Sequence, residues 1–289
     1  MQRIGIDMMG GDYGITATVV GAWLAYNDTE NIKLVLFGDE DYITKEMKRV
    51  SYTIDRSVFE YVDCRKNVDT GDDPYYALKE LQDSSIMKGL EYLSKGKIDV
   101  FCTAGNTGAT FLGAIKHIGA IEGISRPALI SLIPKGNNKF GILLDVGANA
   151  NCKPENLLDF AKLGFEYAKK IGIENPRVGL LNIGSEKGKG NTLVKESFDL
   201  LEDTPNFIGN IEGGDLLGDK ADVYVCDGFT GNILLKFCES LVTKGLPRFD
   251  SEQYGGMPIL GLNKPVIIGH GKSSTVAIKN MIETAIKNI

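Results

Sequence analysis

The chain has 289 residues, of which 43% are hydrophobic and 24% charged, so it is long enough to bury a sizeable core and is not a disordered segment. Its formal net charge of −6 provides no basic surface field, which argues against nucleic acid as the main partner. Five separated cysteines without a C-x-x-C pair, with only two histidines, argue against structural zinc, and we expect neither a metal nor a cofactor.

Short β-branched segments alternate with helical periodicity along the whole chain, which predicts repeated βα units around a largely parallel sheet. The predicted strands are residues 3–7, 33–37, 99–103, 140–145, 177–182, 207–209, 223–226 and 266–268. Residues 156–171 have apolar side chains at helical spacing after Pro154, which predicts an amphipathic helix, and a buried helix is expected to open near Asn106. No linker or repeat divides the chain, so we predict one domain over residues 1–289.

Four loops share one pattern. Each follows the end of a predicted strand, is rich in Gly, Asn, Thr or Asp, and precedes a predicted helix. They occupy residues 8–12, 104–109, 145–150 and 227–232. In a parallel sheet such loops lie at the carboxyl edge, where their glycines let backbone N–H groups approach an anion beside a helix N-terminus. One such loop alone is more often a plain helix cap. None matches the glycine pattern of a dinucleotide site or a P-loop.

A fifth loop, residues 182–191, carries two lysines, and lysine is a mobile charge suited to phosphate. We interpret Lys187 as a surface residue, whereas for Lys189 a phosphate-binding role and a surface role are equally supported. His270 follows the last strand, ahead of a helix beginning near Thr275, and is either a substrate-orienting or a structural residue. No Ser/His/Asp or Cys/His nucleophile pairing is present, which indicates an external nucleophile.

Eight motifs resemble one family in order and spacing, over nearly the whole chain. They are I-D-M-M-G-G-D, D-S-S, A-G-N-T-G-A, R-P-A, L-L-D-V-G-A-N, G-L-L-N-I-G, D-G-F-T-G-N and Y-G-G-x-P-x-L-G. The family is that of the acyl-ACP:phosphate acyltransferases (PlsX). The resemblance implies an α/β fold, a three-layer α/β/α sandwich with a mostly parallel sheet of the isocitrate/isopropylmalate dehydrogenase type, and usually a homodimer.

The resemblance also implies transfer of an acyl group from acyl carrier protein to inorganic phosphate, yielding acyl phosphate for phospholipid synthesis by a downstream glycerol-phosphate acyltransferase. Phosphate is already deprotonated at neutral pH, so such an enzyme holds an anion against a thioester carbonyl and stabilises negative charge on its oxygen. Carried over by position, the catalytic candidates are Lys189 and Asn232. The substrate-binding candidates are Asp7, Gly10, Gly11, Asp12, Asn106, Thr107, Gly108, Asp145, Asn149, Asn191, Asp227, Gly228, Thr230, Gly231 and His270.

The sequence departs from the family pattern in several places. Tyr13 stands where the family usually has His, and Lys272 stands where a small residue is more common. Residues 77–82 are less basic than usual, so the landing surface for the acidic carrier protein is weaker or elsewhere. Residues 239–254 are too short for the long helical hairpin with an apolar tip that many members carry. With no secretory signal at the N-terminus, we expect a cytoplasmic protein with at most weak peripheral membrane association.

Three alternatives remain open at the level of sequence. A short-chain acyl-CoA phosphotransacylase would use the same phosphate loops but need a site for the coenzyme A nucleotide. An NAD-dependent dehydrogenase on the same fold would need an adenosine-binding element and a metal held by acidic side chains. A catalytically retired relative that only binds acyl carrier protein would account for Tyr13 and the short segment at residues 239–254.

Overall fold

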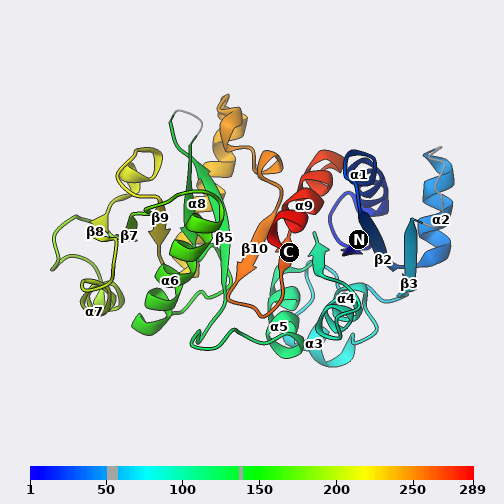
Figure 1. Ribbon diagram of the computed structural model, residues 1–289, viewed down its shortest axis with the longest axis horizontal. Coiled ribbons are helices and arrows are strands. Elements are labelled where there is room, and N and C mark those ends of the chain that lie inside the picture. Colours follow the sequence, from blue (N-terminus) through cyan, green and yellow to red (C-terminus); the bar gives the residue numbers. More distant parts are fainter. Residues whose placement is uncertain (51–57, 137–138) are drawn as a thin grey trace. The chain divides into compact units, whose positions relative to one another are not determined.

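The computed structural model describes residues 1–50, 58–136 and 139–289, and the chain folds into two compact units (Figure 1). Unit 1 consists of Met1–Gly119 and Ser251–Ile289, and unit 2 consists of Ala120–Asp250. The single domain expected over residues 1–289 stays a prediction, and each unit is described by itself.

Unit 1 contains a six-stranded portion of sheet in the order β3-β2-β1-β4-β11-β10. The strands are β1 (Gln2–Asp7), β2 (Ile32–Gly38), β3 (Phe59–Asp63), β4 (Val100–Thr103), β10 (Met257–Leu260) and β11 (Val266–Ile268). All neighbours pair in parallel except β10 and β11, which are antiparallel. The loops after β1, β4 and β11 therefore leave the sheet at one edge, the carboxyl edge of the parallel strands.

Helices cover both faces of this sheet. They are α1 (Gly14–Asp28), α2 (Glu40–Arg49), α3 (Pro74–Glu80), α4 (Ser85–Ser94), α5 (Thr107–His117) and α9 (Thr275–Asn288). On one face, Ile4 and Ile6 of β1 pack in a buried cluster with Ile278 and Ile282 of α9 and with residues of α1. On the other face, α4 approaches so closely that a Cβ on Gly89 would lie 1.9 Å from the Phe101 ring. The alternation of side chains along each strand supplies both cores.

Unit 2 contains a five-stranded portion of sheet in the order β5-β6-β9-β7-β8. Its strands are β5 (Ala128–Pro134), β6 (Phe140–Leu144), β7 (Val178–Leu181), β8 (Phe207–Ile211) and β9 (Val223–Val225). β5 and β6 pair antiparallel, and the remaining neighbours are parallel. The loops after β6, β7 and β9 therefore emerge at the carboxyl edge of the parallel strands in this unit.

The helices of unit 2 are α6 (Pro154–Lys170), α7 (Thr192–Leu201) and α8 (Gly228–Ser240), with the 3-10 turn η1 (Gly213–Leu217). α6 lies close on one face, where a Cβ on Gly164 would be 2.5 Å from Val223. From the opposite face Tyr224, fully buried, donates a hydrogen bond from its hydroxyl to the carbonyl of Leu216 in η1 at 3.0 Å. Unit 2 is thus also layered around its sheet.

The strands expected from the sequence are all present to within two residues at either end, and the prediction of an α/β fold with a mostly parallel sheet is confirmed. The expected helices begin at Pro154, Thr107 and Thr275. β3, β5 and β10 were not expected. β10 contains Pro258 and β5 ends in Pro134, and proline usually argues against a strand because it cannot donate to the ladder.

Residues 241–254 contain three 3-10 turns, η2 (Leu241–Lys244), η3 (Pro247–Phe249) and η4 (Ser251–Tyr254). Across the described residues, no helix combines the length and apolar character needed to cross a bilayer.

Candidate functional site

Asp145 organises the loop that follows β6 in unit 2. Its buried carboxylate accepts hydrogen bonds from the backbone N–H of Leu129 (3.1 Å), Gly147 (3.2 Å), Ala148 (3.1 Å) and Asn149 (2.6 Å), and from the Asn149 side-chain amide (2.9 Å). Burial raises the pKa of this carboxyl group, and the hydrogen bonds from the loop oppose that rise. Five donors around one side chain hold the loop in a single conformation.

The loop between β9 and α8 packs directly on the Asp145 loop. The N–H of Gly228 donates to the carbonyl of Asn149 at 2.8 Å, and the side-chain amide of Asn232 donates to the carbonyl of Val146 at 3.0 Å. A Cβ on Gly231 would lie 1.9 Å from the Asp145 carbonyl oxygen, so only glycine permits this approach. The D-V-G-A-N and D-G-F-T-G-N motifs therefore form one assembly.

The starts of α7 and α8 are capped by the predicted site residues. Asp227 accepts from the backbone N–H of Thr230 at 2.9 Å and from its hydroxyl at 2.8 Å, and Asn191 accepts from the N–H of Val194 at 3.0 Å. Helix caps of this kind satisfy one of the otherwise unpaired first amides. In α8 the N–H of Gly228 is engaged as well, by the Asn149 carbonyl, and the positive dipole ends of both helices favour a negatively charged ligand.

The two lysines of the 182–191 loop have different environments. Lys187 pairs with Asp199 at 3.3 Å and with Glu202, and its ammonium lies 5.3 Å from the centre of the Phe198 ring. Lys189 is exposed, and within the described chain it makes no ion pair. Its carbonyl accepts from the Asn182 side chain at 3.1 Å, which closes the loop. Lys189 is thus the lysine that is available to a ligand.

A polar hollow of about 570 Å³ lies where the chain enters α6, α7 and α8. Its lining residues are Ala150, Asn151, Cys152, Asn191, Leu193, Asp227, Phe229 and Thr230. The starts of α7 and α8 contribute to it, together with residues 150–152 ahead of α6. The positive dipole ends of α7 and α8 suit an anion. The Asp227 carboxylate also lines the hollow, so an anion that still carries a proton can donate a hydrogen bond to it.

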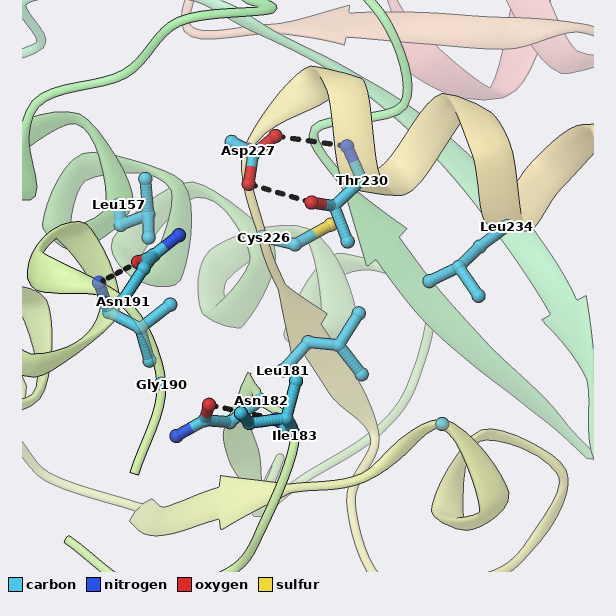
Figure 2. A pocket seen from close by; sticks show the side chains of 12 residues that line it. Leu157, Leu181, Asn182, Ile183, Gly190, Asn191, Cys226, Asp227, Thr230 and Leu234 are labelled. Atoms are coloured by element: carbon cyan, nitrogen blue, oxygen red, sulfur yellow. Dashed lines mark hydrogen bonds between the residues drawn. The ribbon is translucent and has the colours of Figure 1, made fainter. Parts of the chain in front are cut away.

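An apolar cavity of about 390 Å³ borders the polar hollow (Figure 2). Its apolar walls are Leu157, Leu181, Ile183, Val194, Cys226 and Leu234, and its other lining residues are Asn182, Gly190, Asn191, Gly213, Asp227 and Thr230. Asn191, Asp227 and Thr230 line both spaces, so these three residues form a common rim.

In unit 1, the comparable carboxylate is that of Asp7, the last residue of β1. Its buried carboxylate accepts from the Thr103 hydroxyl at 2.6 Å and from the N–H of Met9 at 3.0 Å, and burial raises the pKa of this group. A Cβ on Gly10 would lie 2.6 Å from both the Asp7 carboxylate and the Gly105 nitrogen. The loops after β1 and β4 are therefore pressed together.

The other predicted residues of unit 1 belong to the same loop edge. Gly11 has a positive φ of 96°, and the N–H of Asp12 donates to the Gly271 carbonyl at 2.6 Å, which ties the β1 loop to the loop after β11. His270 accepts from the N–H of Lys272 at its Nδ1, at 3.1 Å. The substrate contacts expected of these residues stay predictions.

Asn106 uses both ends of its amide within the fold. Its oxygen caps α5 by accepting from the N–H of Ala109 at 2.9 Å, and its nitrogen donates to the carbonyls of Asp69 (3.1 Å) and Asp72 (3.0 Å). The next two predicted residues, Thr107 and Gly108, begin that helix, and a Cβ on Gly108 would lie 2.6 Å from the Pro74 ring. This loop is therefore held by contacts within unit 1.

Sequence reasoning assigned no role to the apolar cavity or to Arg126. The Arg126 guanidinium is exposed and lies 3.5 Å from the Asn149 side-chain oxygen, beside the Asp145 loop. The R-P-A motif was its only signal. The only feature of the sequence that points to Ile183 is that it is a large apolar residue in a loop of Gly, Asn and Ser.

Solved structures share this fold at low identity. A phosphotransacetylase from Streptococcus pyogenes matches with a TM-score of 0.75 at 17% identity, over 99% of this chain and 93% of that one. A 4-hydroxythreonine-4-phosphate dehydrogenase from Klebsiella pneumoniae matches with a TM-score of 0.62 at 13% identity, over 99% of each chain. Fold and loops define an α/β protein of the isocitrate/isopropylmalate dehydrogenase type, with its candidate ligand loops at the carboxyl edge of the strands.

Sequence comparison identifies the family. The profile of the fatty acid synthesis protein family matches residues 2–246. A phosphate acyltransferase of Dictyoglomus turgidum is 40% identical over 100% of this chain and 94% of its own length, and one of Wolinella succinogenes is 38% identical with the same coverage. The chain therefore belongs to the fatty acid synthesis protein family, the PlsX family, and the resemblance seen in its motifs is confirmed.

Proposed function

We propose that this member of the phosphate acyltransferase family transfers an acyl group from the thioester of acyl carrier protein to inorganic phosphate. A phosphate oxygen attacks the thioester carbonyl carbon, the new C–O bond forms, and the C–S bond breaks. The proton of hydrogen phosphate passes to the departing thiolate, so the products are acyl phosphate and the free carrier thiol. The reaction needs no nucleophile from the protein, and the sequence contains no recognisable nucleophile motif.

The observation that carries the proposal is the polar hollow at the starts of α6, α7 and α8. The Asn191 and Asp227 caps fix two of these starts, and the five hydrogen bonds to Asp145 hold the loop that leads to the third. Preorganised amides can hold phosphate without reorganising during the reaction, which lowers the barrier to attack. Asp227 would accept the proton of the bound phosphate as a hydrogen bond.

Lys189 and Asn232 are the catalytic residues of this proposal. Lys189 is exposed, lies two residues before the Asn191 cap and would neutralise phosphate charge. Asn232 donates one amide hydrogen to the Val146 carbonyl, and its second hydrogen would stabilise the negative carbonyl oxygen of the tetrahedral intermediate. Arg126, close to Asn149, would add to the positive potential.

The proposal extends to the setting of the enzyme. The acyl phosphate would serve a downstream glycerol-phosphate acyltransferase in phospholipid synthesis, and the enzyme would act in the cytoplasm as a homodimer with at most weak peripheral membrane association. The short 3-10 turns within residues 241–254 support weak attachment, because they form no amphipathic helix of the kind that inserts into an interface.

The test is formation of acyl phosphate from acyl carrier protein and phosphate, trapped with hydroxylamine. Lys189→Ala and Asn232→Ala should each lower kcat/KM about a hundredfold, the typical cost of removing a transition-state donor. Lys187→Ala is the matched control, because its ammonium is already paired on the surface, and it should leave the rate unchanged. Acyl-CoA replaces the carrier in a parallel assay. Turnover of acyl-CoA alone would favour the phosphotransacylase alternative, and a fully active Lys189→Ala would remove that residue from the mechanism.

A further inference from the structure

The apolar cavity has walls from four separate elements. Leu157 comes from α6, Leu181 from β7, Val194 from α7 and Leu234 from α8, so the space is built by the tertiary fold and not by one loop. Its volume of about 390 Å³ lies within the range of small-molecule sites. Walls of this composition suit an occupant that is itself apolar.

The polar side chains of the lining are engaged within the fold. The Asn182 side-chain oxygen accepts a hydrogen bond from the N–H of Ile183 at 2.8 Å. Its side-chain nitrogen donates to the Lys189 carbonyl at 3.1 Å, so both ends of the amide are engaged. The Asp227 carboxylate binds Thr230, and the Asn191 oxygen caps α7 (Figure 2). An occupant gains little hydrogen bonding from these atoms, whereas the side chains of the apolar walls can only offer apolar contact.

Ile183 marks the entrance. The residue is 83% exposed although it stands only two residues after the buried strand β7, and it lines the cavity. Exposed apolar surface beside a cavity commonly marks a binding site, since a ligand that covers it removes that surface from water.

We propose that this cavity holds the acyl chain of the donor and that its walls set the preferred chain length. The inference rests on the proposed function and adds the location of the chain. The rim of Asn191, Asp227 and Thr230 is shared with the polar hollow, so a thioester carbonyl at this rim directs its apolar tail into the cavity. Phosphate in the polar hollow then faces the carbonyl from the other side. Val194, Leu234 and Ile183 are the specificity-determining residues.

The experiment compares kcat/KM for butyryl, octanoyl and palmitoyl donors in the wild type and in variants that fill the cavity. Val194→Phe and Leu234→Trp, on different helices, should lower the palmitoyl to butyryl ratio at least about tenfold while butyryl transfer continues. Ile183→Ser, a substitution at an exposed side chain, should raise KM for palmitoyl donors more than KM for butyryl donors. Phe237→Ser is the control, since Phe237 is 61% exposed on α8 and does not line the cavity.

An unchanged chain-length ratio in the two filled variants, with urea unfolding midpoints near that of the wild type, would overturn the proposal. A second readout separates this failure from failure of the proposed function. If the wild type makes no acyl phosphate from any donor, binding of cis-parinarate, a fatty acid that fluoresces when shielded from water, decides the matter. Weaker binding by Val194→Phe and Ile183→Ser, but not by Phe237→Ser, supports the cavity as an acyl site, and equal binding by all variants overturns it.

Discussion

Asp7 of unit 1 and Asp145 of unit 2 lie in equivalent places, each buried at the carboxyl end of a strand and ahead of a loop that contains glycine. They differ in what they bind. Asp145 accepts from five N–H groups, four of them in its own loop. Asp7 accepts from the N–H of Met9 and from the hydroxyl of Thr103 on the neighbouring strand, and Ser85 and Gly10 also favour its ionised form. Asp145 therefore closes one loop on itself, and Asp7 ties two loops together.

A buried carboxylate at the end of a strand therefore has a different structural role in each unit. The Asp145 loop presents its backbone to the α8 start, and the four backbone N–H donors to Asp145 cannot become acceptors for another side chain. The Thr103 hydroxyl can rotate and become an acceptor, so the connection made by Asp7 adapts more easily. The hydrogen bonds of Asp145 thus fix the loop that leads to the polar hollow.

The largest expected effect comes from Asp145→Asn. The side-chain NH2 of the new asparagine would face N–H groups that now donate to the carboxylate, so buried donors would lose their acceptor. The free energy of unfolding should fall by about 3 to 4 kcal/mol. Asp7→Asn should cost only about 1 to 2 kcal/mol, because Thr103 can accept from the new amide. Urea unfolding of both variants measures the difference. Equal losses would show that the two carboxylates are organised alike.

A smaller effect is expected where the loops approach other backbone. Gly231→Ala places a methyl group 1.9 Å from the Asp145 carbonyl oxygen and should cost about 2 to 3 kcal/mol, together with most of the activity. Gly10→Ala meets the Asp7 carboxylate and the Gly105 nitrogen at 2.6 Å and should cost somewhat less. Gly214→Ala serves as the control, as no atom lies within 4 Å of the added group. A harmless Gly231→Ala would mean that the two unit 2 motifs do not pack as described.

The smallest effect concerns the helix that follows the Asp7 loop. Thr16 of α1 donates to Glu46 of α2 at 2.5 Å, and Arg49 donates to the same carboxylate at 2.6 Å. Hydrogen bonds from Arg49, then from Thr16, lower the pKa of Glu46 from 4.5 to about 2. Because the folded-state pKa is the lower one, this stabilisation is present above pH 4.5 and is lost as the pH falls toward about 2.

Urea midpoints measured between neutral pH and about pH 3 should therefore fall more steeply for the wild type than for Glu46→Gln. At neutral pH the variant should be less stable by about 1 kcal/mol. This loss is small because the Arg49 side chain is 63% exposed and solvent screens its interaction with Glu46. Parallel curves for the two proteins would count against the pairing. Asp7 and Asp145 act with the opposite sign, since their raised pKa values reduce stability as the pH rises above 3.8.

Much of the fold was predictable from local pattern. β-branched runs, the Pro at the start of α6 and the Asp, Asn and Ser caps act over a few residues, so the order of strands, loops and helices could be inferred. β5 and β10 escaped prediction because each contains a proline, and their pairing with antiparallel neighbours makes them strands nonetheless. Four of the candidate residues, Asn106, Asn191, Asp227 and Asp145, proved to hold helix starts or loops, a role that a loop motif alone does not distinguish from ligand contact.

The sequence by itself determined the α/β class, the glycine-containing loops and the resemblance to the PlsX family, because each of these rests on residues close together in the chain or on motifs in order. Only the tertiary structure decided which loops meet. Asn149 and Gly228 are far apart in sequence yet joined by a hydrogen bond of 2.8 Å, and the apolar cavity draws its walls from α6, β7, α7 and α8. Such contacts depend on how distant segments pack, and no local pattern encodes the space that remains between them.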